Sequence, residues 1–166
     1  MNNKVVHMLA RGLLMAGVIA VRFNFRGVGE SQGDHGGGEA EQQDAVAMAA
    51  WVRDRWPGLP LCLGGFSFGA RVALCAFSRL APDVLVTVAP PVHRIDPVAV
   101  QPSCPWLVIQ GDEDEVVDVE AVIAWLNALE PGPELRLMSG VDHFFHGRLT
   151  ELRDGVAEFL TANLSP

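Results

Sequence analysis

Gly65-Phe66-Ser67-Phe68-Gly69 is a Gly-x-Ser-x-Gly pentapeptide between an apolar run at 59–65 and a helix-like run at 70–80. A strand that turns sharply into a helix at such a pentapeptide holds the serine in a strained conformation, with its hydroxyl above the sheet. The two glycines are expected to keep Cβ atoms out of the tight contact between strand and helix. The pattern favours a nucleophile at Ser67, although the same five residues in another context would form an ordinary loop.

The composition is that of a globular chain with an acidic surface. Its 166 residues suit one domain, expected to span positions 1–166, and a domain of this size buries about 70% of its unfolded surface. Hydrophobic residues make up 49% of the chain and charged residues 19%, which is typical of a soluble domain. The net charge of −8 argues against nucleic acid or a membrane surface as a partner.

The cysteines and the amino-terminal residues indicate a cytoplasmic protein. Cys62, Cys75 and Cys104 are odd in number, and we expect them to behave as small buried hydrophobes. No Cys-x-x-Cys pair offers a zinc site, and the sequence implies no metal and no cofactor. The apolar stretch at 12–21 is too short to span a bilayer, so we interpret it as the end of a helix followed by a strand.

Helices and strands alternate along the chain. The sequence predicts helices at 3–16, 39–56, 70–80, 119–129 and 148–164, and strands at 18–25, 59–66, 84–89, 106–110 and 134–138. A glycine-rich loop is expected at 26–38 and an irregular, proline-containing connection at 90–105. This alternation predicts an α/β protein with three layers, α/β/α, around a mainly parallel sheet. In such sheets a ligand binds beyond the carboxyl ends of the strands.

Candidate catalytic groups follow three of the predicted strands. Ser67 follows the strand at 59–66, an acidic segment at 111–117 follows the fourth strand, and a histidine-containing segment at 139–146 follows the fifth. Serine, acid, histidine is the chain order of hydrolases built on sheets of this kind. The serine needs a histidine to take its proton and return it to the leaving group, and the histidine needs a carboxylate to fix its tautomer. The sequence therefore predicts a serine hydrolase.

Three further segments carry a resemblance to a known superfamily. Asn24-Phe25-Arg26-Gly27-Val28-Gly29-Glu30-Ser31 is similar to its Arg-Gly-x-Gly-x-Ser turn, Gly111-x-x-Asp114-x-x-Val117 to its acid turn, and Asp142-His143-Phe144-Phe145 to its histidine loop. With the pentapeptide, these segments resemble the α/β-hydrolase superfamily over nearly the whole chain, and within it a compact bacterial branch of serine hydrolases. The resemblance implies that Ser67 is the nucleophile, Asp114 the orienting acid and His143 the general base. It also implies that the backbone N–H of Phe68 is an oxyanion donor.

Some neighbouring residues remain alternatives. Asp112 is the alternative acid, whereas Asp118 is expected to cap the next helix. His146 is the alternative base, but it lies one helical turn further on and is expected to cap a helix or line the rim. His35, in the glycine-rich loop, is the candidate for substrate contact among the other histidines. The rest are expected to be surface or structural residues: His7 and His93.

One part of the superfamily pattern is missing. In that superfamily a stretch like Met1-Asn2-Asn3-Lys4-Val5-Val6 follows earlier strands and a His-Pro, glycine-rich loop that supplies the second oxyanion donor. The resemblance thus implies a chain truncated at its N-terminus, with Met1 an internal methionine. Loss of one oxyanion donor costs about 100-fold to 1,000-fold in turnover. Missing strands also expose a sheet edge, so we expect weak activity and self-association through that edge.

Other functions fit the sequence less well. Asp112-Glu113-Asp114-Glu115-Val116 matches a signature of haloacid-dehalogenase-like phosphatases, but those enzymes need a later lysine and Lys4 is the only one. The glycines after the first strand have the wrong spacing for a dinucleotide site. The non-enzyme alternative is a hydrolase fold with an impaired triad that acts by binding.

The substrate is expected to be a small acyl compound. A carboxylic ester is the default, and a thioester or small amide is the alternative. The shortness of the connection at 90–105 favours an open site. Trp106 and Phe144 are candidates to line it, but we expect both in the core.

Overall fold

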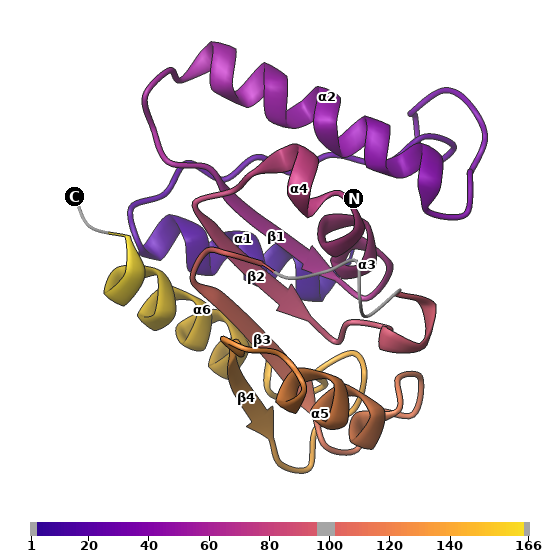
Figure 1. Ribbon diagram of the computed structural model, residues 1–166, viewed down its shortest axis with the longest axis vertical. Helices are drawn as coiled ribbons and strands as arrows, with labels where there is room; N and C mark the ends of the chain where they lie inside the picture. The colour runs from indigo at the N-terminus through magenta and orange to yellow at the C-terminus, as the bar shows by residue number, and fades with distance from the viewer. Residues whose placement is uncertain (1–2, 96–101, 165–166) are drawn as a thin grey trace.

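The computed structural model describes residues 3–95 and 102–164, which form a four-stranded parallel sheet with helices on both faces (Figure 1). Neighbouring strands follow the order β1-β2-β3-β4. The elements are α1 (Lys4–Met15), α2 (Glu39–Arg55), β1 (Cys62–Phe66), α3 (Phe68–Cys75), α4 (Phe77–Leu80), β2 (Val84–Val88), the 3₁₀ turn η1 (Val92–Arg94), β3 (Trp106–Gly111), α5 (Val119–Asn127), β4 (Glu134–Met138) and α6 (Leu149–Asn163). This arrangement confirms the predicted three-layer α/β/α fold.

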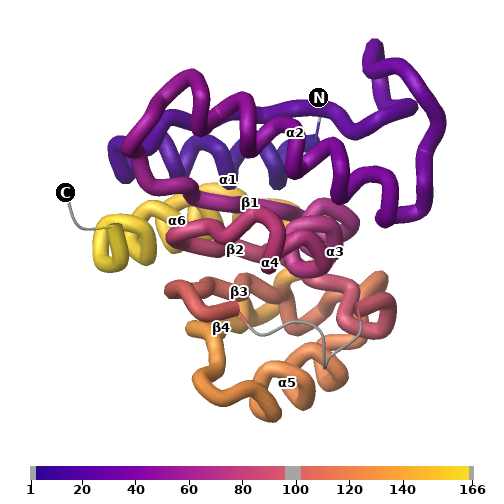
Figure 2. The backbone as a smooth tube through the Cα atoms, turned by 45° about the horizontal axis from the view of Figure 1, so that its top comes forward, coloured from indigo at the N-terminus to yellow at the C-terminus, as the bar shows by residue number. Residues whose placement is uncertain are grey.

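Both faces of the sheet are buried, which explains why the central strands are almost wholly apolar. Val86 of β2 faces α1 and α6, whereas its neighbour Leu85 faces α3 and α5. Figures 1 and 2 show α1 beside α6 on one side of the sheet, with α5 on the other. Gly12 of α1 permits a close helix crossing, because a Cβ there would lie 2.8 Å from Val156 Cβ of α6. Within the described ranges, no helix has the length and apolar character needed to cross a membrane.

The strand predicted at 18–25 is absent, so this prediction is wrong. The segment pairs with no strand in the described parts of the chain, and Phe23 and Phe25 pack against the cluster around Ala45 of α2 and Val72 of α3. Alternating apolar residues can be buried by such packing alone, whereas a strand also needs a hydrogen-bonded neighbour. β1 is an outer strand of the described sheet, and Gly64 at its centre is exposed. Association through this edge stays a prediction.

The other predicted elements are present with shifted bounds. The predicted helix at 70–80 is two helices, α3 and α4, that meet at Ala76. The predicted cap at Asp118 is confirmed, since its Oδ1 accepts from Ala121 N at 3.1 Å, and the Asn3 side chain caps α1 by accepting from Val5 N and Val6 N. The irregular connection predicted at 90–105 is described at 90–95, which includes η1, and at 102–105, directly before β3. Positions 96–101 lie outside the described residues.

Candidate active site

The turn from β1 into α3 places Ser67 at a sharp apex. Ser67 has a φ of 49° and a ψ of −113°, a conformation that a residue with a side chain rarely adopts. Its N–H donates to Val88 O of the neighbouring strand at 2.8 Å, which ties the apex to the sheet. Gly65 is required at this turn, because a Cβ there would lie 2.4 Å from Gly69 O. The expectation for Gly69 is wrong, since a Cβ at Gly69 would point into open space.

Gly65→Ala is expected to destabilise the fold by about 3 kcal/mol, because the added methyl group meets backbone atoms that cannot move aside easily. Gly69→Ala is the matched control. It adds the same methyl group without a clash and replaces a helical glycine, so it should be neutral or stabilise by about 0.5 kcal/mol. Urea unfolding of both variants measures the difference. Equal stability of the two variants would show that the close contact at Gly65 is not needed.

The turn after β3 holds Asp114 inside the protein. The Asp114 side chain is fully buried, and its Oδ1 accepts from Val116 N at 2.9 Å and Val117 N at 2.8 Å. Gly111 lets this turn approach the segment after β4, because a Cβ at Gly111 would lie 2.2 Å from Val141 O. The glycine and valine of the predicted Gly-x-x-Asp-x-x-Val turn thus have structural roles beside the acid.

The segment after β4 holds His143 over the same end of the sheet. The backbone N–H of His143 donates to Glu115 Oε2 at 3.2 Å, and this bond joins the segment to the turn that holds Asp114. Phe145 anchors the segment, since its side chain is fully buried in the core although its φ is 57°. The His143 ring packs 5.0 Å from the Phe66 ring and 5.1 Å from the Phe144 ring, measured between centroids. Sequence reasoning missed Glu115 and the anchoring role of Phe145.

Ser67, His143 and Asp114 form one chain of hydrogen bonds. His143 Nε2 lies 3.1 Å from Ser67 Oγ, and His143 Nδ1 lies 2.8 Å from Asp114 Oδ2. A carboxylate only accepts, so Nδ1 carries the proton and Nε2 is free to accept from the serine hydroxyl. The histidine side chain is 4% exposed and the aspartate side chain 0%, so both are shielded from water. The structure therefore brings together the three side chains that the sequence singled out.

The alternative acid and base lie outside this chain of hydrogen bonds. Asp112 is exposed, and its Oδ1 accepts from Gly140 N at 2.6 Å. His146 is exposed, and its Nδ1 lies 2.5 Å from Asp142 Oδ2. The hydrogen bond from His146 holds the pKa of Asp142 below its usual value. These contacts give both alternatives structural roles.

Trp106 and Phe144 were both expected in the core, and only Trp106 is buried there. Trp106 is buried in the core as predicted, and its Nε1 donates to Thr87 Oγ1 at 2.9 Å. Phe144 is 46% exposed, so its predicted burial is wrong; the burial of Phe145 leaves its neighbour facing outward. The three cysteines are free as expected, but each is only partly buried. Burial raises the pKa of each thiol, that of Cys62 to about 12, which keeps them protonated.

The glycine-rich loop at 26–38 is held beside the serine turn by two carboxylates of α2. Asp44 Oδ1 accepts from Arg26 Nη2 at 2.6 Å. The buried Glu41 accepts from Gly36 N at 2.7 Å and from Gly38 N at 2.6 Å. Burial raises the pKa of Glu41, but the backbone N–H donors outweigh it and leave this pKa below its usual value. The loop places the His35 ring 5.0 Å from the Phe68 ring, beside the candidate nucleophile.

Asp44→Asn is expected to make folding stability less dependent on acid pH. The hydrogen bond from Arg26 holds the pKa of Asp44 below its usual value in the folded protein. Its charged form therefore stabilises the fold above the unfolded-state pKa of about 4, and this contribution is lost as the pH falls through the lower folded-state pKa. The difference in unfolding free energy between wild type and variant should be largest near neutral pH and shrink below about pH 4. Urea unfolding across this range measures it, with Asp34→Asn in the same loop as control; a difference independent of pH would contradict the prediction.

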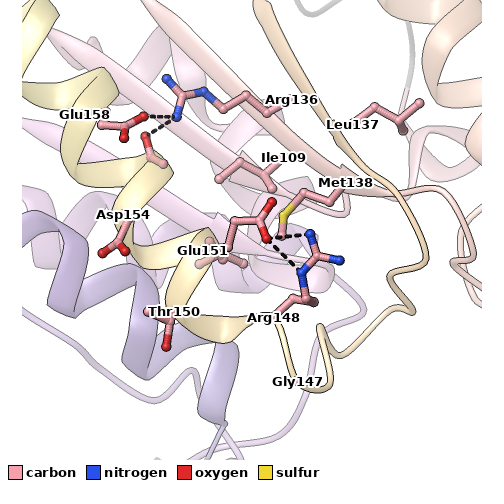
Figure 3. A pocket seen from close by; sticks show the side chains of 12 residues that line it. Ile109, Arg136, Leu137, Met138, Gly147, Arg148, Thr150, Glu151, Asp154 and Glu158 are labelled. Atoms are coloured by element: carbon pink, nitrogen blue, oxygen red, sulfur yellow. Dashed lines mark hydrogen bonds and ion pairs between the residues drawn. The ribbon is translucent and has the colours of Figure 1, made fainter.

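A separate pocket lies between β4 and the N-terminal half of α6 and is not the candidate site. This pocket has a volume of about 560 Å³. Figure 3 shows the side chains that line it. Its arginines are already paired, Arg136 with Glu158 at 2.9 Å and Arg148 with Glu151 at 2.5 Å. None of the three hydrogen-bonded side chains lines it. Across the described parts of the chain, no three His, Cys, Asp or Glu side chains are grouped so as to hold a metal ion.

A parallel sheet covered on both faces, with a serine at a strained strand-to-helix apex, defines the α/β-hydrolase class. The chain belongs to the alpha/beta hydrolase domain family, whose model matches residues 1–158. The structure is similar to XC6422 from Xanthomonas campestris, an α/β serine hydrolase without a lid. The TM-score is 0.95 and the identity 48%, and the match covers 100% of this chain and 77% of that chain.

Two further relatives support the family. An α/β serine hydrolase homologue from Coxiella burnetii has a TM-score of 0.90 and 45% identity, over 99% of this chain and 78% of its own. The protein RP471 of Rickettsia prowazekii (strain Madrid E) is 33% identical over 172 residues, which cover 96% of this chain and 72% of that protein. The chain therefore spans about three quarters of the length of these relatives.

Proposed function

We propose that this chain is a serine hydrolase that cleaves small carboxylic esters or thioesters through an acyl-enzyme intermediate on Ser67. The observation that carries the proposal is the unbroken line of hydrogen bonds from Ser67 Oγ through His143 to the buried Asp114. The serine hydrolase from Xanthomonas campestris, at 48% identity, supports the same reaction class.

The proposed reaction has two halves. The Ser67 Oγ–H proton passes to His143 Nε2 as Oγ attacks the substrate carbonyl carbon, and Asp114 stabilises the imidazolium that forms. The bond from the carbonyl carbon to the leaving oxygen or sulfur then breaks, and the leaving group takes the proton from Nε2. Water next gives a proton to Nε2 and attacks the acyl-enzyme. The bond from the acyl carbon to Ser67 Oγ breaks, Oγ regains a proton, and the carboxylic acid leaves.

The backbone N–H of Phe68 is the proposed oxyanion donor. Phe68 is the first residue of α3, so its N–H has no carbonyl partner within the helix. The partial positive charge at a helix N-terminus also favours the negative oxygen of the tetrahedral intermediate. Both effects act at the residue that follows the nucleophile.

A small acyl group suits the proposed site. XC6422 has no lid, and we propose an equally open site for this chain. The exposed Phe144 ring lies against the His143 ring, where it offers an apolar surface to an acyl or alcohol group. A panel of esters and thioesters of increasing acyl length, assayed with one common leaving group, identifies the preferred substrate class.

A fluorophosphonate probe tests the proposed function directly, because it reacts preferentially with an activated serine. We expect one probe per chain, attached at Ser67 and located by mass spectrometry after proteolysis. Absence of labelling together with absence of turnover across the ester panel would reject the proposal and support a role in binding instead.

A further inference from the structure

Gln110, the penultimate residue of β3, is a buried polar residue that exchanges no proton in the proposed reaction. It is fully buried, and its side chain belongs to a strand whose other residues are mostly apolar. Its Nε2 donates to Asp114 Oδ2 at 2.9 Å and to Gly111 O at 3.2 Å. Asp114 Oδ2 is the oxygen that also binds His143 Nδ1.

The orientation of the Gln110 amide follows from its neighbours. Both groups beside Nε2 are acceptors, a carbonyl and a carboxylate, so rotating the amide by half a turn would place Oε1 against two acceptors. With Nε2 facing these two acceptors, Oε1 has no hydrogen-bond partner among the described residues. A buried polar atom without a partner is unfavourable, whereas an apolar side chain of similar size would avoid that cost. The favourable contact that offsets it is the hydrogen bond to Asp114.

With Gln110, the Asp114 carboxylate accepts four N–H groups. Oδ1 accepts from the backbone N–H groups of Val116 and Val117. Oδ2 accepts from the side-chain amide Nε2–H of Gln110 and the ring Nδ1–H of His143. Two donors on each oxygen fix the plane of the carboxylate, and that plane sets the direction of the hydrogen bond to the histidine ring. Without Gln110, Oδ2 would keep only the histidine, and the ring would be held less firmly at 3.1 Å from Ser67 Oγ.

We propose that Gln110 is a positioning residue that holds the Asp114 carboxylate, and through it the His143 ring, in the geometry for proton transfer from Ser67. The inference rests on the proposed hydrolase function. Gln110 should affect kcat and not substrate binding, because it is buried and acts on the reacting atoms only through Asp114.

Gln110→Met tests the proposal, since methionine keeps the approximate volume and removes the donor. We expect kcat for ester hydrolysis to fall about 10-fold to 100-fold with KM unchanged, by analogy with the hydrogen-bond partners that orient metal ligands. Ile109→Met is the matched control, because it alters the adjacent buried position on the opposite face of β3. The NMR resonance of the His143 Nδ1 proton should move in Gln110→Met and stay in place in Ile109→Met. A kcat of Gln110→Met within about twofold of the control would overturn the proposal.

Gln110→His returns a ring N–H at a similar reach and serves as the rescue variant. If Gln110→Met does not fold, Gln110→His decides alone: a kcat within about threefold of wild type supports the proposal, and a loss as large as that of Asp114→Asn overturns it. If the wild type hydrolyses no ester and takes no probe, the proposed function fails instead. The Nδ1 proton resonance then still tests Gln110, and an unchanged resonance in Gln110→Met would reject its positioning role.

Discussion

Ser67→Ala is expected to lower kcat/KM for ester hydrolysis by about 10⁴-fold or more, because no other group replaces the covalent nucleophile. The fold should be unaffected, since alanine has the same Cβ at the φ of 49° that serine already adopts. Steady-state kinetics on the preferred ester measure the loss, and fluorophosphonate labelling should disappear with it. The residual rate reports what the oxyanion donor and substrate binding contribute without the nucleophile.

Ser78→Ala is the matched control for this variant. Ser78 lies exposed on α4, so its replacement should leave both turnover and labelling unchanged. Labelling that persists in Ser67→Ala would show that the probe reacts elsewhere, and Ser67 would lose its proposed role.

Asp114→Asn is expected to lower kcat by about 10⁴-fold while the protein stays folded. An asparagine oxygen accepts from the backbone N–H groups much as the carboxylate does. Its NH₂ group, however, donates, and facing His143 Nδ1 it would favour the tautomer with the proton on Nε2. That tautomer cannot take the proton of the serine hydroxyl. The variant also lacks the charge that stabilises the imidazolium, so turnover should fall at every pH.

Asp112→Asn separates this effect from a general loss of negative charge in the turn. Asp112 lies two residues away in the same turn and binds Gly140 N, so its replacement should change kcat less than about threefold. Circular dichroism and thermal unfolding establish that both variants fold. A larger loss in Asp112→Asn than in Asp114→Asn would reverse the assignment of the acid.

The serine turn and the order of the functional segments were predictable because they depend on local sequence. A glycine at 65 is the residue that the turn can accommodate, as the 2.4 Å approach to Gly69 O demonstrates. The caps at Asn3 and Asp118 were predictable for the same reason, since each side chain binds backbone N–H groups within three residues.

Features that depend on distant partners were not predictable in the same way. The segment at 18–25 has an apolar pattern suited to a strand, yet its pairing depends on which neighbour lies beside it, and Phe23 and Phe25 pack against helices instead. Phe144 and Phe145 are identical in type and adjacent, so only the direction of the loop decides which is buried. No sequence pattern points to Gln110, because its role depends on the Asp114 carboxylate, which the turn after β3 places beside it.

Local sequence patterns were enough to predict the alternation of helices and strands, the sharp turn at Ser67 and the positions of the candidate acid and histidine after later strands. These follow from hydrophobic periodicity and from steric limits on single residues, which act over a few positions. The folded structure was needed to show that Asp114 and not Asp112 faces His143, that Phe144 is exposed, and that Gln110 completes the hydrogen bonds of Asp114. Hydrogen bonds require atoms to lie within about 3 Å in the correct direction. Such proximity arises when parallel strands bring residues far apart in the chain to one edge of the sheet.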